Sequence, residues 1–310
     1  MNFPRLVVFG EALTDFIRTD NSNWNSAAGG SCWNVACVSA RLGISTGFAG
    51  SVSCDIFGDE LIQKSINVGL DMRFMNQVNR APFFSMVIES NPPKYFFIGE
   101  NSADLAFDPE HLPSGWFDEV EIVYFGSLSL VREPLASRLI EIAEAAYACH
   151  KKIVFDPNFR EQMKKPSYST TLRRLVGLAT YLKISSGDLS GLFPDLEEIA
   201  AIAQIREWNP TATLLITHGE SGIELIDGNT RLFQPAFPVD VKDTIGCGDA
   251  SISSWIASLL ERPYAQEIEH LQFAAACSSI VAGQRGSYAP TISEIKTLLR
   301  SKSITTMLWN

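Results

Sequence analysis

The sequence predicts an α/β protein built on a mostly parallel β-sheet with helices on both faces. Two observations support this prediction. Short apolar runs, which are typical of buried strands, alternate along the chain with longer segments whose apolar residues recur at helical spacing. Consecutive strands joined through a helix pair in parallel with right-handed crossovers, so this repeated order gives a sheet that is covered on both sides.

Six apolar runs are the predicted strands of this sheet. Each is short and apolar, as expected where both faces of a strand are buried. The runs are Leu6–Phe9, Thr46–Ala49, Ile122–Phe125, Ile153–Phe155, Tyr181–Ile184 and Leu214–Thr217. Helical spacing covers residues 32–42, 57–68, 134–149, 168–179, 195–206, 248–261, 266–283 and 291–301.

Two regions break this order and predict a second, smaller sheet. The runs 83–88 and 94–98 flank Asn91-Pro92-Pro93, a turn signal, and therefore predict an antiparallel hairpin. Residues 14–19 also alternate apolar and polar side chains. We expect these pieces to form a lid over a cleft or a contact between two copies of the chain, and the two roles are compatible.

The chain shows no internal repeats, low-complexity tracts or obvious linkers. We therefore expect a single domain over residues 1–310, with a lid formed by about 11–27 and 82–104.

Composition limits the classes of function. The 310 residues are 46% hydrophobic and 19% charged, which is enough apolar material for a sizeable core. A net charge of −10 without a Lys/Arg cluster argues against a nucleic-acid partner. The sequence shows no signal-like segment, no apolar run long enough to cross a membrane, and no zinc or C-x-x-C spacing among its six cysteines. A reduced, cytoplasmic, soluble protein is expected.

The segment Asp243–Asp249 carries the strongest chemical signal. Gly246 and Gly248 bracket one small residue, and Asp249 follows where a long apolar helical run begins. Free backbone N–H groups at a helix N-terminus bind phosphate, and an adjacent carboxylate can remove a proton from an attacking hydroxyl. Helix capping by Asp249 is the alternative, and this segment alone does not decide between them. A P-loop is excluded because its G-x-x-x-x-G-K-[ST] pattern is missing, and the absent third glycine disfavours a Rossmann turn.

A second glycine pair, Gly29-Gly30, leads into the predicted helix that carries Asn34. Glycines let a ligand lie against the backbone, Asn34 can bond a hydroxyl, and Asp15 can accept from further hydroxyls. The alternative is an ordinary loop-to-helix junction, with Asn34 solvated and Asp15 on the surface.

Five motifs in this order resemble the ribokinase-like, PfkB-type carbohydrate kinase family, and within it the fructokinases most. They span almost the whole chain, and five matches in register are far more specific than any one of them. The motifs are Gly10–Asp15, Gly29-Gly30 with Asn34, Asp156–Arg160, Ile216–Gly222 and Asp243–Asp249. The resemblance implies a three-layer α/β/α domain with a mostly parallel central sheet and a small β-sheet lid.

The resemblance also implies a reaction, ATP-dependent phosphorylation of a sugar hydroxyl, with D-fructose to fructose 6-phosphate expected. It makes Asp249 the general base, with an anion hole at Gly246, Cys247 and Gly248. The implied sugar-binding residues are Asp15, Gly29, Gly30, Asn34, Asn101 and Arg160. The implied nucleotide-binding residues are Lys183, Ser185, Thr217, Gly219, Gly222, Ala275 and Ser278.

Two cations are implied in the same way. Mg²⁺ accompanies ATP, and Asp188 stands where relatives often carry a glutamate near the nucleotide metal. A monovalent cation, with K⁺ expected, is implied at Asp243, Thr244, Ser279, Ala282 and Ser287. The implied partners are therefore a small-molecule sugar and ATP, without nucleic acid or membrane, and a homodimer through the lid is left open.

Departures from the family pattern leave the substrate open. Cys247 stands where relatives usually have alanine, and its small side chain and intact N–H should preserve the anion hole. The bulky Trp33 is expected in the core, with stacking on the sugar as the alternative. The stretch Gly99–Asp104 lacks the arginine that relatives often place before the alanine–aspartate pair, which leaves Asn101 as the contact there. Kinases for 2-keto-3-deoxygluconate, ribose or a nucleoside are the alternatives, together with a catalytically weak sugar-binding regulator.

Overall fold

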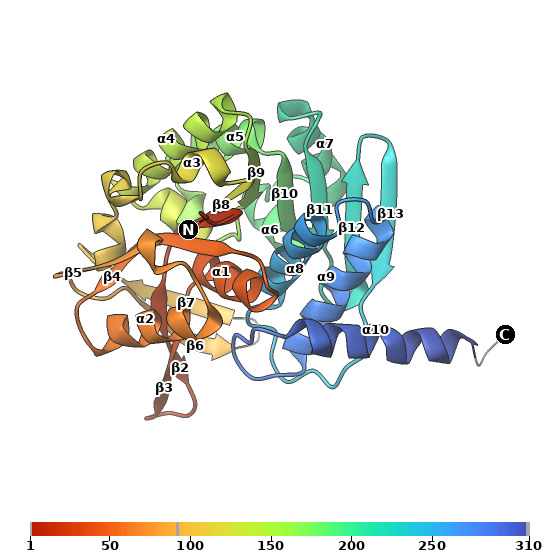
Figure 1. The fold of residues 1–310 in the computed structure, drawn as a ribbon, viewed down its shortest axis with the longest axis horizontal. Coiled ribbons are helices and arrows are strands. Elements are labelled where there is room, and N and C mark those ends of the chain that lie inside the picture. Colours follow the sequence, from red (N-terminus) through yellow and green to blue (C-terminus); the bar gives the residue numbers. More distant parts are fainter. Residues whose placement is uncertain (1, 91–92, 308–310) are drawn as a thin grey trace.

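The computed structural model describes residues 2–90 and 93–307, whose strands form two sheets (Figure 1). The strands of the larger sheet are β1 (Leu6–Phe9), β4 (Thr46–Ser53), β5 (Met75–Val78), β8 (Ile122–Gly126), β9 (Lys152–Asp156), β10 (Tyr181–Ser185), β11 (Thr213–Thr217), β12 (Gly222–Asp227) and β13 (Thr230–Pro235). Their order is β13-β12-β11-β10-β9-β8-β1-β4-β5. Neighbours from β11 to β5 pair in parallel, and within the described residues only β12 runs against the other strands, because it pairs antiparallel with both β11 and β13. The predicted mostly parallel sheet is confirmed.

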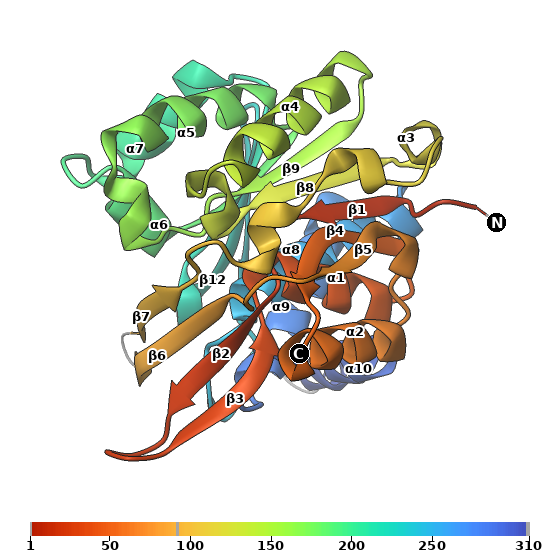
Figure 2. The same cartoon turned by 90° about the vertical axis from the view of Figure 1, so that its left-hand side faces the viewer.

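Helices cover both faces of this sheet (Figures 1 and 2). One layer consists of α1 (Ser31–Arg41), α2 (Ile56–Val68), α8 (Cys247–Glu261), α9 (Glu267–Ala282) and α10 (Ile292–Met307). The other consists of α3 (Trp116–Glu119), α4 (Leu135–Ala148), α5 (Pro166–Leu178), α6 (Ser186–Leu192) and α7 (Glu198–Trp208). All the predicted helical segments are present. Among the described residues, none of the helices has the length and apolar character that a bilayer crossing requires.

The alternation of side chains along each strand builds two cores at once. Leu6 and Val8 of β1 pack with the layer that contains α1 and α8, whereas Val7 and Phe9 pack with the layer that contains α4 and α5. All four side chains are fully buried. Burial of a large apolar side chain stabilises the fold by about 1.5–3 kcal/mol. Because every side chain of such a strand is buried, the strand appears in the sequence as a continuous apolar run.

The smaller sheet consists of β2 (Leu13–Arg18), β3 (Trp24–Gly29), β6 (Phe84–Ser90) and β7 (Pro93–Ile98), in the order β3-β2-β6-β7. The predicted hairpin is confirmed, since β6 and β7 pair antiparallel; its turn residues 91–92 lie outside the described part of the chain. Strand β2 pairs in parallel with β6 and antiparallel with β3. The small sheet projects from one side of the large one (Figure 2).

Three strands of the large sheet, β12 and the two edge strands β5 and β13, were not among the six predicted runs. Along β13, side chains alternate between exposed and half-buried, and β5 carries polar Asn76 and Gln77 among its four residues. An edge strand with one solvated face lacks the continuous apolar run that marked the central strands.

Gly222→Ala tests how tightly β12 and β13 are joined. Gly222 has φ 134°, and a Cβ there would lie 2.2 Å from the Gln234 carbonyl oxygen. We expect the substitution to lower the free energy of unfolding by about 2 kcal/mol or more in urea titrations, from backbone strain and the clash. Gly177→Ala in α5 is the control, because its Cβ would meet nothing within 4 Å. That variant should match the parent or gain about 0.5–1 kcal/mol, and equal stability of the two variants would contradict this account.

Candidate active site

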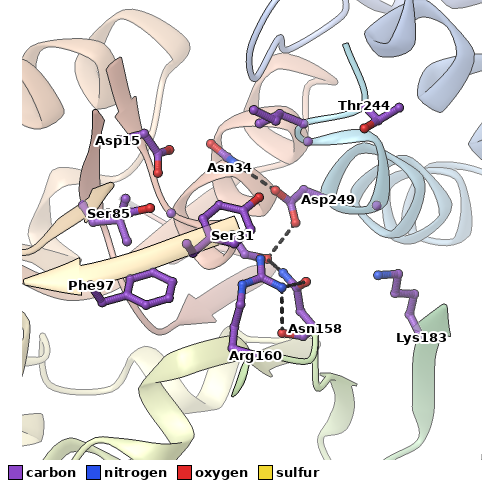
Figure 3. A pocket seen from close by; sticks show the side chains of 16 residues that line it. Asp15, Ser31, Asn34, Ser85, Phe97, Asn158, Arg160, Lys183, Thr244 and Asp249 are labelled. Atoms are coloured by element: carbon purple, nitrogen blue, oxygen red, sulfur yellow. Dashed lines mark hydrogen bonds between the residues drawn. The ribbon is translucent and has the colours of Figure 1, made fainter. Parts of the chain in front are cut away.

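A cavity of about 230 Å³ opens between the small sheet and the carboxyl ends of the central strands (Figure 3). Ligands of parallel α/β proteins bind at this edge of the sheet because the loops after the strands converge there. Predicted residues from both ends of the chain meet around the cavity: Asp15, Gly30, Asn34, Arg160, Lys183, Thr244, Gly246, Gly248 and Asp249.

Asp249 lies in the first turn of α8 and is only 7% exposed. Its Oδ1 accepts a hydrogen bond from Ser31 Oγ at 2.7 Å, and its Oδ2 accepts one from Asn34 Nδ2 at 2.9 Å. Burial raises the pKa of Asp249, although these two donors oppose the rise. Both oxygens therefore bond across to α1, so Asp249 does not serve as a plain cap of its own helix, and Asn34 is not solvated.

The turn before α8 presents free backbone donors to the cavity. Gly246 is the N-cap and holds φ 80°, a left-handed conformation that favours glycine. The N–H of Cys247 bonds to the Thr244 carbonyl at 3.2 Å, whereas those of Gly246 and Gly248 have no hydrogen-bond partner within the described residues. Burial raises the pKa of the Cys247 thiol to about 12, so it stays neutral beside this turn. An anion at this point would meet N–H groups and the positive end of the helix dipole.

Lys183 brings a buried cation to the same point. Its Nζ lies 3.1 Å from Asp156 Oδ2, and a Cβ on Gly248 would approach Nζ to 3.1 Å. Burial opposes the charge on Lys183, but Asp156 and the neighbouring carboxylates outweigh it and raise its pKa. Burial raises the pKa of Asp156 to about 6 even though Lys183 acts against that rise. The ammonium group therefore stays charged against the N-terminus of α8.

Asp15 faces the cavity from β2, on the opposite side to Asp249 (Figure 3). Burial raises its pKa to about 6. Gly29 makes room for it, since a Cβ on Gly29 would lie 2.2 Å from Asp15 Oδ2. Ser85 of β6 lines the cavity as well, and its buried hydroxyl faces the Asp15 carboxylate and opposes the rise in the Asp15 pKa. This side of the cavity thus offers an acid with a hydroxyl beside it.

Arg160 supplies a cation without a carboxylate partner in the described part of the chain. Its Nη1 donates to Asn158 Oδ1 at 2.8 Å, and its guanidinium carbon lies 4.9 Å from the centre of the Tyr95 ring. Tyr95 and Phe97, both on β7, line the cavity too. Phe97 therefore contributes to the cavity wall, while Phe96 is 58% exposed on the opposite face of β7.

The predicted nucleotide-binding residues other than Lys183 lie outside this cavity. Ser185 and Thr217 end the neighbouring strands β10 and β11, and Gly219 and Gly222 bound the turn that follows. The remaining two are on α9, where Ala275 is buried and Ser278 Oγ donates to the Cys247 carbonyl at 3.1 Å. Together they extend from the turn before α8 along the carboxyl edge of the sheet.

The predicted metal residues are bonded within the chain. Asp188 Oδ1 accepts the Phe159 N–H at 2.8 Å and Oδ2 accepts the Ser185 N–H at 2.9 Å, in a capping box of α6. Burial opposes its ionisation, but Lys183 and these donors hold its pKa below the usual value. Within the described residues, no cluster of three or more His, Cys, Asp and Glu is suited to a metal ion.

The predicted monovalent site joins two loops. Asp243 Oδ1 accepts from the Ile245 N–H and Oδ2 from the Gly286 N–H, at 3.0 and 2.9 Å. The Ala282 carbonyl accepts from the backbone N–H of residue 242, and Ser279 Oγ accepts from that of residue 237. Ser287 lies beside Gly246, and Thr244 lines the cavity.

One predicted site residue lies outside the cavity, and two residues that line the cavity were not predicted. The structure does not bring Asn101 to the cavity: it lies in an exposed turn with φ 55°. Ser31 and Ser85 were missed, although a serine inside the apolar run of β6 was a visible signal for the latter. Trp33 is in the core as predicted, with its Nε1 donating to Ser65 Oγ at 2.9 Å.

Comparison with known proteins places this site in a family, because residues 4–294 match the pfkB family carbohydrate kinase. The chain belongs to this family. It is a sugar kinase whose relatives include Fructokinase-1 of Oryza sativa subsp. japonica, 26% identical over 311 residues, with 94% of this chain and 96% of that one covered. Fructokinase-1 of Zea mays is 26% identical over 314 residues, with 95% and 97% covered.

Solved structures show the same ribokinase-like fold. The structure of fructokinase with bound ATP from Xylella fastidiosa has a TM-score of 0.88 and 25% identity, and covers 97% of this kinase and 100% of that chain. Fructokinase from Vibrio cholerae O395, in its fructose, ADP and calcium ion bound form, has a TM-score of 0.85 at 22% identity, with 96% and 99% covered.

Asp15→Asn tests the burial of the acid that faces Asp249. A folded-state pKa of about 6, above the ordinary 3.8, means that ionising Asp15 destabilises the native state increasingly as pH rises from about 4 to about 6. The variant should therefore match the parent at pH 4 and be more stable at pH 7, by about 1–2 kcal/mol after allowance for solvent screening. Urea unfolding at several pH values measures this difference, and a difference that is constant with pH would contradict the assignment.

Proposed function

We propose that this sugar kinase transfers the γ-phosphoryl group of ATP to the 6-hydroxyl of D-fructose, giving fructose 6-phosphate and ADP. The observation that carries the proposal is the buried Asp249 carboxylate at the N-terminus of α8, inside a cavity that also holds Asp15 and Arg160. Relatives named fructokinase along nearly the whole chain support the choice of sugar.

The proposed transfer uses few covalent steps. Asp249 accepts the proton of the attacking sugar hydroxyl while the hydroxyl oxygen bonds to the γ-phosphorus of ATP. The bond between the γ-phosphorus and the β,γ-bridging oxygen breaks, and ADP leaves with that oxygen. The free N–H groups of Gly246 and Gly248 and the ammonium of Lys183 stabilise the charge that develops on the phosphoryl oxygens. General-base assistance of this kind contributes about 10²- to 10⁴-fold in rate.

The sugar is proposed to bind between the small sheet and α1. The Asp15 carboxylate accepts from sugar hydroxyls, Asn34 and Arg160 donate to their oxygens, and Gly30 lets the sugar approach the backbone. The small sheet would then act as a lid that excludes water from the phosphoryl group. Arg160 also supports a second candidate, 2-keto-3-deoxygluconate, because a guanidinium without a carboxylate partner suits an acidic sugar.

The nucleotide is proposed to lie along the carboxyl ends of β10 and β11, against α9. The residues proposed to contact it are Lys183, Ser185, Thr217, Gly219, Gly222, Ala275 and Ser278. The Xylella fastidiosa structure, which contains ATP, supports a nucleotide site in this fold.

Two cations complete the proposal. Mg²⁺ bound with ATP would neutralise phosphate charge, with Asp188 reaching it through water, since each of its oxygens already accepts one N–H and retains further lone pairs. The oxygen donors of Asp243, Thr244, Ser279, Ala282 and Ser287 are the hard ligands that a K⁺ ion takes. Such an ion would fix the loop that leads into α8.

An ADP-release assay tests this function, with ATP, Mg²⁺ and K⁺ and a panel of fructose, ribose, 2-keto-3-deoxygluconate and a nucleoside. We expect fructose to give the highest kcat/KM, and omission of Mg²⁺ to abolish turnover. Asp249→Asn should lower kcat by about 10²- to 10⁴-fold, because it removes the base, and leave fructose affinity in calorimetry almost unchanged.

Three outcomes would count against the proposal. Higher kcat/KM for another sugar would replace fructose, and turnover undiminished in Asp249→Asn would remove Asp249 as base. Sugar binding without any turnover in the parent protein would favour the regulator.

We also propose a homodimer through the small sheet. Tyr95 and Phe97 face the cavity, so Phe96 and Ile98 project from the other face of β7, where they are 58% and 50% exposed. A second copy of the chain would bury this apolar face. Sedimentation should give a dimer for the parent and a monomer for Phe96→Glu. Tyr264→Glu, at a fully accessible loop position, is the control that should stay dimeric, and a monomeric parent would refute the proposal.

A further inference from the structure

A continuous chain of hydrogen bonds links Arg160 to the carboxylate of Asp249 (Figure 3). Arg160 Nη1 lies 2.8 Å from Asn158 Oδ1, and Asn158 Nδ2 lies 2.7 Å from Ser31 Oγ. Ser31 Oγ lies 2.7 Å from Asp249 Oδ1. Neither Ser31 nor Asn158 has a part in the transfer described above.

The direction of every bond in this chain follows from its two ends. A guanidinium only donates, so the Asn158 atom that faces Arg160 is the amide oxygen, and the amide nitrogen faces Ser31. That nitrogen also only donates, so the single hydrogen of the Ser31 hydroxyl is left for Asp249. Arg160 thereby fixes the amide orientation that would otherwise be ambiguous.

The surrounding backbone is arranged for this contact. Asn158 holds φ 43°, a left-handed conformation in which asparagine is enriched, and its own N–H bonds to Asp156 Oδ1 at 3.1 Å. Ser31 is the first residue of α1, one position after the N-cap Gly30, and α1 has no side-chain cap. The Ser31 hydroxyl is therefore committed to Asp249 and not to its own helix.

We propose that Ser31 is a positioning residue of the phosphoryl transfer, which holds Asp249 Oδ1 through a hydrogen bond whose direction Arg160 and Asn158 impose. The inference rests on the proposed role of Asp249 as base. Ser31 fixes one carboxylate oxygen and Asn34 fixes the other, so the plane of the carboxylate is set before the sugar arrives. A donor to the ionised form also favours that form, which is the one that can accept a proton.

Several elements contribute titratable or charged groups near Asp249. Burial raises the pKa of Asp249. The hydrogen bonds from Ser31 and Asn34 oppose that rise, and the positive charges of Lys183 and Arg160 oppose it to a smaller extent. The other groups coupled to it are Asp15 on β2, Cys32 on α1, Tyr95 on β7, Tyr124 on β8, Asp156 on β9 and Cys247 on α8. Substitution at Ser31 leaves all of these in place.

Ser31→Ala tests the proposal in the full-length protein. Loss of the donor should raise the pKa of Asp249, so the acid limb of the kcat–pH profile should move to higher pH by about half a unit to one unit, with kcat at the optimum lowered about tenfold. Ser31→Thr, which keeps the hydroxyl, should restore both. Asn158→Gly, which suits the left-handed backbone, should shift the limb in the same direction by less.

Ser39→Ala is the matched control, because Ser39 lies on the same helix, is fully buried, and its hydroxyl has no partner among the described residues. Its kcat–pH profile should equal that of the parent. An NMR titration of the Asp249 carboxyl carbon, assigned with Asp249→Asn, gives a readout that needs no substrate. A raised pKa in Ser31→Ala supports the inference even if fructose is the wrong sugar.

The inference and the proposed function fail in different ways. If the parent turns over and Asp249→Asn does not, yet Ser31→Ala keeps the parental pH profile and carboxyl pKa, Ser31 does not position the base. A lower kcat that Ser31→Thr fails to restore, with no shift along the pH axis, also overturns the inference. Turnover undiminished in Asp249→Asn would instead overturn the proposed function.

Discussion

Two helix N-termini meet around one buried carboxylate, and the site depends on this contact. Asp249 in the first turn of α8 accepts hydrogen bonds from Ser31 and Asn34, both in the first turn of α1. The positive ends of both helix dipoles face this anion, which offsets part of the cost of burying it. The Trp255 side chain of α8 and the Val35 side chain of α1 belong to the same hydrophobic core, so apolar burial also holds the two helices together.

Several buried carboxylic acids lie in and around the cavity, and their burial lowers the stability of the fold. The pKa values of Asp15 and Asp156 are raised to about 6 by burial, and that of Asp249 is raised as well. Lys183 is the buried cation that faces two of these acids from β10. Such a concentration of like charge destabilises the folded chain locally, which is typical of sites where ionisable groups are poised for chemistry.

The sequence was most informative where both faces of an element are buried. The runs of β1, β8, β9, β10 and β11 are continuous because each strand serves both cores, whereas β5 and β13 each have an unpaired edge and lack that pattern. The two glycines before Asp249 marked that residue, because glycines let a ligand approach the backbone, whereas Asp15 was marked by its carboxylate soon after the first strand. The importance of Ser31 depends on orientation across 218 positions of sequence, which no local pattern encodes. Asn101 was expected at the sugar and instead lies in an exposed turn with φ 55°, outside the lining of the cavity.

The route of the chain through the small sheet has a mechanical consequence. The backbone enters the sheet from β1 at Leu13, leaves it from Gly29 into α1, enters again at Phe84 after β5, and leaves at Ile98 toward the 3₁₀ turn Ala103–Ala106. The parallel pairing of β2 with β6 joins these two passages into one plate. All four connections lie at one end of the plate, since Leu13 pairs with Gly29 and Phe84 pairs with Ile98. Any movement of the plate therefore turns about this end, and it moves Asp15 together with Tyr95 while pulling on the start of α1.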